Sequence, residues 1–201
     1  MNKLILASAS PRRRELLEQI GMTFEVIPSD IEEKTKSHVP CEMVMELSSM
    51  KAMDIFEKLP SEKRASVIVA GADTVVAFGD CVMGKPADKE KAQEMLSLLQ
   101  GKTHQVYTGV TLVWQEEEGH PPAKFVFYEK TDVSMYPMSE QEICSYVETG
   151  EPMDKAGAYA IQGKCAAFIR EICGDYYNVV GLPIGRLYQE LKIINDKDSK
   201  S

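Results

Sequence analysis

Side chains suited to phosphate chemistry follow the first apolar run of the 201-residue chain. Residues 4–6 are Leu-Ile-Leu, Ser8 comes two positions later, and Arg12, Arg13 and Arg14 stand in a row soon after. The planar guanidinium of arginine matches phosphate oxygens in pairs, so a cluster of this kind can bind an anion. The same row could also form the solvated face of an amphipathic helix.

The residues around the arginines are typical of a strand that leads into a helix. Ser10 suits the N-cap, Pro11 the first helical position and Gly21 the position after the helix end. A helix N-terminus offers free backbone N–H groups and the positive end of the helix dipole. In an anion site, the backbone and the arginine side chains would therefore attract the same anion. Other segments of the chain decide between this site and a solvated helix face.

A carboxylate in an unexpected place gives such support. Residues 66–78 contain two β-branched apolar runs that flank Gly71-Ala72-Asp73-Thr74. Aspartate and glycine are poor choices inside a buried strand. Asp73 is therefore either hydrogen-bonded within a bulge or directed at a ligand. We favour the ligand, because Gly71 and Ala72 leave room for it to approach.

Two lysines lie beside other predicted helices. Residues 40–58 have apolar side chains at three- and four-residue steps, which predicts a helix with a buried stripe. Lys51 lies next to that stripe, so it reaches either the surface or a cleft. Lys85 precedes a second helix that Asp88 would cap.

Two loops contain further polar groups. The stretch from Ser29 to His38 is either a solvated loop or a carboxylate loop that holds a divalent cation near phosphates; its acidic residues are Asp30, Glu32 and Glu33. The stretch from Gly150 to Gly163 is rich in small residues and lacks periodicity, and a loop of that length is usually functional or disordered. Its small and aromatic residues argue against disorder, and its polar members are Asp154, Lys155 and Gln162.

The rest of the chain predicts an α/β or α+β protein with a mixed sheet. Ser139 and Glu142 have the spacing of a capping box. Further strands are expected at 23–28, 104–114, 124–136, 166–172 and 178–180, and further helices at 88–101, at 139–150 and after residue 183.

Composition excludes several classes of protein. The net charge of −8 argues against long DNA or RNA as the main partner, and no apolar run approaches the roughly 18 residues of a membrane span. The five cysteines form no CxxC pair and the three histidines are far apart, which disfavours a zinc site, a disulfide framework and a histidine-based triad. We therefore expect a cytoplasmic protein whose cysteines are reduced.

Several cations with a few carboxylates, and no histidine or cysteine pair, suit phosphoryl chemistry. Cations bind phosphate oxygens and offset charge on the leaving group. Carboxylates hold a metal ion or orient an attacking water.

Taken together, these segments resemble the motif set of the Maf family. The matching stretches are SASPRRRELL, GADTVV, GKP, GKTHQVYTGV, DKAGAYAIQG and NVVGLP, which extend over nearly the whole chain. The resemblance implies a nucleoside triphosphate pyrophosphatase with one domain, residues 1–195, and a charged tail, residues 196–201. It further implies an elongated mixed sheet flanked by helices, two lobes around a cleft, and a fold similar to that of the inosine triphosphate pyrophosphatases. The implied cofactor is a divalent cation, Mg²⁺ or Mn²⁺, and a homodimer stays open.

The resemblance also assigns roles to residues. Asp73 matches the family's catalytic carboxylate, the proton acceptor for water, and could also be a metal ligand. Glu33 is similar to a carboxylate that assists with the metal. The phosphate-facing positions are Ser8, Arg12, Arg13, Lys51 and Lys85. The SSMKA segment around Lys51 departs from the commoner arginine- or alanine-containing versions of its motif.

Three positions distinguish the branches of the family. Arg12, Thr74 and Gln162 match the branch that acts on dTTP and UTP, where the 7-methyl-GTP branch tends to have Trp, Gln and Glu. A glutamine amide offers a donor and an acceptor to a pyrimidine edge, whereas a glutamate suits the donor groups and cationic ring of methylated guanine.

The expected function is a house-cleaning pyrophosphatase that hydrolyses dTTP, UTP and modified pyrimidine nucleotides. One alternative keeps the reaction and changes the base to 7-methyl-GTP or another non-standard nucleotide. The other is a nucleotide-binding regulator of cell division, since the family has been linked to septum formation.

Overall fold

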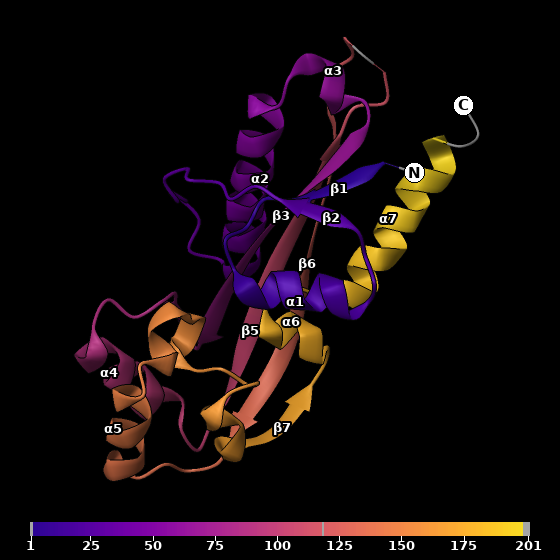
Figure 1. The fold of residues 1–201 in the computed structure, drawn as a ribbon. Helices are drawn as coiled ribbons and strands as arrows, with labels where there is room; N and C mark the ends of the chain where they lie inside the picture. The colour runs from indigo at the N-terminus through magenta and orange to yellow at the C-terminus, as the bar shows by residue number, and fades with distance from the viewer. Residues whose placement is uncertain (1, 118, 199–201) are drawn as a thin grey trace. The chain divides into compact units, whose positions relative to one another are not determined.

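The computed structural model describes residues 2–117 and 119–198, without the side chains of residues 197 and 198 (Figure 1). Its strands have the order β2-β1-β3-β5-β6-β7, with β4 paired to β3. Strand β1 pairs in parallel with β2 and β3, whereas β3–β4 and β6–β7 are antiparallel. The predicted mixed sheet is therefore confirmed. The strands are β1 (Lys3–Leu6), β2 (Phe24–Val26), β3 (Val67–Phe78), β4 (Cys81–Met83), β5 (Thr103–Trp114), β6 (Ala123–Met135) and β7 (Ile169–Cys173).

Helices alternate with the strands along most of the chain. The α-helices are α1 (Pro11–Gln19), α2 (Pro40–Lys58), α3 (Ser61–Arg64), α4 (Lys89–Leu99), α5 (Glu140–Glu148), α6 (Tyr176–Val180) and α7 (Ile184–Asp198). Three 3-10 helices follow α5, namely η1 (Glu151–Asp154), η2 (Ala156–Ala158) and η3 (Lys164–Phe168). Within the described residues, no helix is long and apolar enough to cross a bilayer.

The chain divides into two compact units. Unit 1 comprises Met1–Asp73, Thr108–Tyr128 and Gly181–Ser201, and unit 2 comprises Thr74–Tyr107 and Glu129–Val180. One division between them falls inside β3, at the peptide bond from Asp73 to Thr74.

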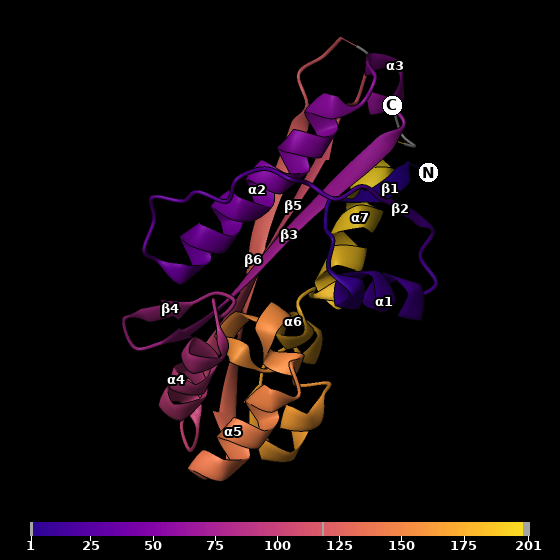
Figure 2. The same cartoon turned by 60° about the vertical axis from the view of Figure 1, so that its left-hand side comes forward.

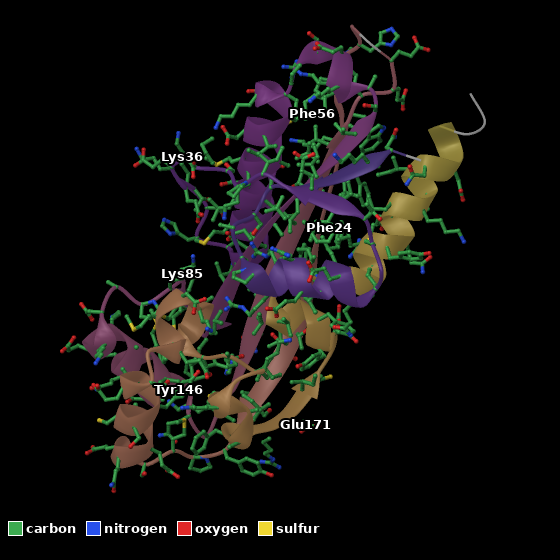
Figure 3. The ribbon with its side chains drawn as sticks, in the orientation of Figure 1. Phe24, Lys36, Phe56, Lys85, Tyr146 and Glu171 are labelled. Atoms are coloured by element: carbon green, nitrogen blue, oxygen red, sulfur yellow. The ribbon has the colours of Figure 1, made fainter. Side chains whose placement is uncertain are left out.

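In unit 1, α2 packs closely against the sheet. Its residues Ala52, Ile55 and Phe56 are buried in one cluster with side chains of β1, β3 and β5, and Figure 3 labels Phe56. Figures 1 and 2 show α2 and α7 on opposite sides of the first part of β3. Gly71 permits the close approach, because a Cβ there would lie 2.3 Å from the Ser48 carbonyl oxygen of α2.

In unit 2, α4 and α5 lie side by side and pack against the 3-10 segments (Figure 2). Leu96, Leu99, Ile143 and Val147 of these helices are buried in one cluster with side chains of β3 to β7. The residues between α5 and β7 are thereby held against a packed core.

Most of the predicted helices are confirmed. Helix α1 begins after Ser10 with Pro11 at its first position, α2 spans the predicted 40–58, and α4 is capped by Asp88. The capping box of Ser139 and Glu142 is formed at α5. Residues 196–198 of the expected charged tail continue α7, and residues 199–201 lie outside the described residues.

One predicted strand is wrong, and another begins three residues later than predicted. Residues 178–180 belong to α6, because the Asp175 carboxylate accepts a hydrogen bond from the Tyr177 N–H and starts a helical turn despite the β-branched valines. Residues 164–168 form η3, so β7 begins at Ile169 rather than at Ala166.

Candidate active site

Asp73, Lys51 and Glu33 form the charged centre of unit 1. The Lys51 ammonium donates to Asp73 Oδ1 at 2.6 Å and lies 2.8 Å from Glu33 Oε1. The side chain of Lys51 is 12% exposed and that of Glu33 is 53% exposed, so the cluster runs from the interior to the surface. One ammonium therefore pairs with two carboxylates, one from β3 and one from the loop before α2.

Asp73 is a buried carboxylate with a perturbed pKa. It is 8% exposed, and burial raises its pKa above the ordinary aspartate value, while the positive charges of Lys51 and Arg13 oppose that rise. A carboxylate with a raised pKa is a stronger base and is suited to accept a proton. Asp73 lies within β3, so the sheet holds it rigidly.

Ser8 and Arg13 join the end of β1 to the start of α1. The Arg13 guanidinium donates to Ser8 Oγ at 3.0 Å, to the Ala72 carbonyl oxygen at 2.9 Å and to the Gly181 carbonyl oxygen at 2.8 Å. Ser8 Oγ also accepts from the Ser10 N–H at 3.3 Å. Burial lowers the pKa of Arg13 despite the nearby Asp73. Arg13 thus fixes the residue that precedes Asp73.

The neighbouring arginines differ in their surroundings. Arg12 is half-buried, and its charge acts on Arg13, lowering the Arg13 pKa. Arg14 is mostly exposed and donates to Glu18 Oε1 at 2.8 Å along the helix surface. Arg14 is therefore the solvated member of the row.

The other predicted site residues lie in unit 2. Thr74 follows Asp73 in β3, and Lys85 is exposed on the segment before α4, where Figure 3 labels it. The Lys155 ammonium donates to Asp154 Oδ1 at 2.5 Å and to the Glu151 carbonyl oxygen at 2.8 Å. Gln162 is exposed on the turn between η2 and η3.

Backbone contacts connect these residues within unit 2. The Gly157 N–H donates to the Gly84 carbonyl oxygen at 3.1 Å, directly beside Lys85. A Cβ at Gly157 would lie 2.8 Å from the Val76 side chain, two residues after Thr74. The 150–163 loop therefore contacts both the strand that carries Thr74 and the segment that carries Lys85.

Sequence reasoning missed the polar side chains that support this loop. Glu151, Tyr146, His104 and Tyr159 make hydrogen bonds across it. A weak signal was available for one of them: Tyr146 lies three residues after Ile143 on a predicted amphipathic helix, which places its hydroxyl on the buried face.

The donor set fits a divalent cation only in part. No group of three or more His, Cys, Asp or Glu side chains that could hold a metal ion occurs among the described residues. The Asp73 and Glu33 carboxylates do converge on a single ammonium, as described above. Because Mg²⁺ is commonly bound by one or two carboxylates together with substrate phosphates, these two residues fit a cation that is completed by nucleotide oxygens.

Comparison with known proteins identifies the family. Residues 3–194 match the family model described as "Maf-like protein". The chain belongs to the Maf family. It is 52% identical over 200 residues to a dTTP/UTP pyrophosphatase of Agathobacter rectalis, which covers 96% of this chain and 97% of the relative.

Two further relatives have the same name as the first. Proteins of Lachnoclostridium phytofermentans and Bacillus anthracis, both named dTTP/UTP pyrophosphatase, are 47% identical to the chain over 192 and 196 residues. These matches cover 95% or more of each of the two relatives and 96% or more of the chain. A solved structure of the Staphylococcus aureus Ham1 protein matches 67% of this chain and 72% of its own, with 13% identity and a TM-score of 0.39.

Proposed function

We propose that this Maf protein hydrolyses dTTP and UTP, and modified pyrimidine nucleotides of the same shape, to the nucleoside monophosphate and pyrophosphate. The observation that carries the proposal is 52% identity over nearly the full length of a protein named dTTP/UTP pyrophosphatase. Five free cysteines are compatible with a reducing compartment, and we place the enzyme in the cytoplasm.

In the proposed reaction, Asp73 accepts a proton from the attacking water. Burial raises the pKa of this carboxylate, which makes it a stronger base than an exposed aspartate once it is ionised. Lys51, 2.6 Å from Asp73 Oδ1, keeps the ionised form available. Water adds to phosphorus, the anhydride bond to the leaving group breaks, and pyrophosphate departs with the bond electrons.

Cationic side chains and the N-terminus of α1 would bind the phosphates. Backbone N–H groups after Ser10 and the positive end of the helix dipole add to the attraction. The proposed phosphate ligands are Ser8, Arg12, Arg13, Lys51 and Lys85. Asp73 and Glu33 would hold a divalent cation, Mg²⁺ or Mn²⁺, which when bound neutralises phosphate charge.

The proposal assigns selection of the nucleotide base to three side chains. Gln162 is exposed on its turn and presents an amide donor and acceptor that match the edge of uracil or thymine. Thr74 is half-buried beside Asp73, and Arg12 is half-buried on α1. Asp154 and Lys155 complete the loop that faces the substrate.

The test is pyrophosphate release from dTTP, UTP, CTP, 7-methyl-GTP and ITP, each at the same concentration with Mg²⁺ or Mn²⁺. The proposal expects the highest kcat/KM values for dTTP and UTP. A preference for 7-methyl-GTP would overturn the base assignment. No release from any nucleotide would overturn the reaction and favour a nucleotide-binding regulator of cell division.

A further inference from the structure

The Glu151 side chain contacts the turn that carries Gln162. Its carboxylate accepts a bifurcated hydrogen bond from the Lys164 N–H, at 3.1 Å to Oε1 and 3.2 Å to Oε2. A Cβ at Gly163 would lie 2.1 Å from Oε1, so only glycine lets the turn rest on this carboxylate. Glu151 thus holds the chain immediately after Gln162.

Tyr146 holds the same turn from its other end. Its hydroxyl accepts from the Ala160 N–H at 3.1 Å and donates to Glu151 Oε1 at 2.8 Å. The side chain is 5% exposed in the interior of unit 2, where Figure 3 labels it. Burial raises the pKa of Tyr146, so the hydroxyl keeps the proton that it donates.

A second hydrogen bond anchors the residues just before the turn. The wholly buried His104 ring makes a 2.8 Å hydrogen bond from Nε2 to the Tyr159 hydroxyl. Burial lowers the pKa of His104 to about 4, so this contact is between neutral groups at physiological pH. Nearby Ala158 adopts φ 60°, a conformation that a residue with a Cβ keeps only where its surroundings impose it.

Together these contacts fix the backbone at residues 158–160 and 163–164, while the Gln162 side chain between them is exposed. Fixing the backbone that carries an exposed side chain lowers the conformational entropy that is lost on binding. The loop is therefore built as a rigid support for a single recognition residue.

We propose that Glu151 and Tyr146 are positioning residues for base selection, which they exert through Gln162. This inference rests on the proposed function, since it presupposes that Gln162 contacts the pyrimidine. The Glu151 side chain joins the two anchors, because its Oε1 accepts from both the Tyr146 hydroxyl and the Lys164 N–H. A glutamine oxygen in the place of Oε1 has two lone pairs and can accept from both donors, whereas an alanine removes both contacts.

Steady-state kinetics of Tyr146→Phe with UTP and CTP tests the inference. These two substrates differ at the edge that an amide would read. We expect KM for UTP to rise ~10-fold with kcat within about 3-fold of wild type, and the UTP-to-CTP ratio of kcat/KM to fall by a similar factor. Tyr136→Phe, a hydroxyl deletion at a tyrosine that is 51% exposed, is the matched control and should leave both values unchanged.

A double-mutant cycle separates positioning from a general structural effect. If Tyr146 acts through Gln162, then Gln162→Ala and the double variant with Tyr146→Phe should have the same UTP-to-CTP ratio. Ratios that fall by the product of the two separate effects would overturn the inference. Glu151→Ala, which removes both contacts, is put through the same cycle and decides between the two outcomes if Tyr146→Phe does not fold.

The failure of each proposal has its own signature. A wild-type enzyme that releases no pyrophosphate from UTP or dTTP overturns the proposed function. A wild-type enzyme that is selective for UTP, with the same selectivity in Tyr146→Phe and Glu151→Ala, overturns only the positioning role.

Discussion

The two units support their polar residues by different physical means. Unit 1 carries a buried carboxylate, an ammonium and a guanidinium on β3, α2 and α1, where regular structure fixes each charge. Unit 2 presents exposed polar residues on turns. The turn that carries Gln162 is held by hydrogen bonds of two tyrosine hydroxyls, one imidazole and one carboxylate. The difference matches the demands of proton transfer and of base recognition, since the first needs a perturbed pKa and the second needs a solvent-accessible amide.

The largest effect is expected at Asp73. Asp73→Asn should lower turnover by ~10²–10⁴-fold while nucleotide binding is retained, because the amide keeps the shape of the carboxylate but cannot accept the proton. Pyrophosphate release and equilibrium binding of a non-hydrolysable nucleotide measure the two quantities. Asp80→Asn, at an exposed turn residue, is the control. Near-normal turnover of Asp73→Asn would remove this residue from the role of base.

Lys51→Met should lower turnover by ~10-fold or more and shift the pH profile. Lys51 lowers the pKa of Asp73, so its removal raises that pKa further. A general base acts only in its deprotonated form, so activity falls as the pH drops below its pKa. The acidic limb of the pH profile should therefore lie at higher pH in Lys51→Met than in the wild-type enzyme. The profile of kcat/KM against pH is the measurement.

Lys58→Met, at an exposed lysine of the same helix, should keep the wild-type profile. An unshifted acidic limb in Lys51→Met would show that the 2.6 Å contact does not tune the base.

In unit 2, Gln162→Glu should change selectivity more than rate. The carboxylate loses the amide donor, so we expect kcat/KM for UTP relative to 7-methyl-GTP to fall ~10-fold, with a smaller change in kcat. Gln141→Glu adds the same charge at an exposed position of α5 and serves as the control. An equal loss on every nucleotide would mean that position 162 does not read the base.

The smallest effect concerns the packing beneath the unit 1 charges. Gly71→Ala places a Cβ 2.3 Å from the Ser48 carbonyl oxygen and forces α2 away from β3, at a cost of about 1–3 kcal/mol in the free energy of unfolding. Gly185→Ala, which meets nothing within 4 Å, should instead stabilise α7 by about 0.5–1 kcal/mol. Chemical denaturation compares the two, and equal effects would contradict the close packing of α2 on β3.

Local chemistry made much of the fold predictable. Pro40 and a regular apolar stripe were enough to predict α2, and the Ser139–Glu142 spacing was enough for α5. The strand predicted at residues 178–180 is wrong because valines favour strands, whereas the Asp175 side chain starts a helical turn there. Strand propensity is decided by context, which a single sequence does not display.

The candidate site was predictable only where local sequence marked a residue as unusual. Asp73 stood out because a charge inside an apolar strand is costly unless it is partnered. Its partner Lys51 lies 22 positions earlier in the chain, and only the packing of α2 on β3 brings the two together. Glu151 carried no comparable signal, because nothing in an irregular loop fixes which residues meet, and Tyr146 was marked only by its place on the buried face of α5.

The most direct test of this division of roles is the UTP-to-CTP ratio of kcat/KM in the wild-type enzyme, Asp73→Asn and Gln162→Ala. We predict that Asp73→Asn loses activity on both nucleotides in proportion and keeps the wild-type ratio. We predict that Gln162→Ala keeps kcat within a few-fold, on the order of 1 kcal/mol, and loses most of the ratio. A changed ratio in Asp73→Asn, together with an unchanged ratio in Gln162→Ala, would contradict the assignment of proton transfer to Asp73 and of base reading to Gln162.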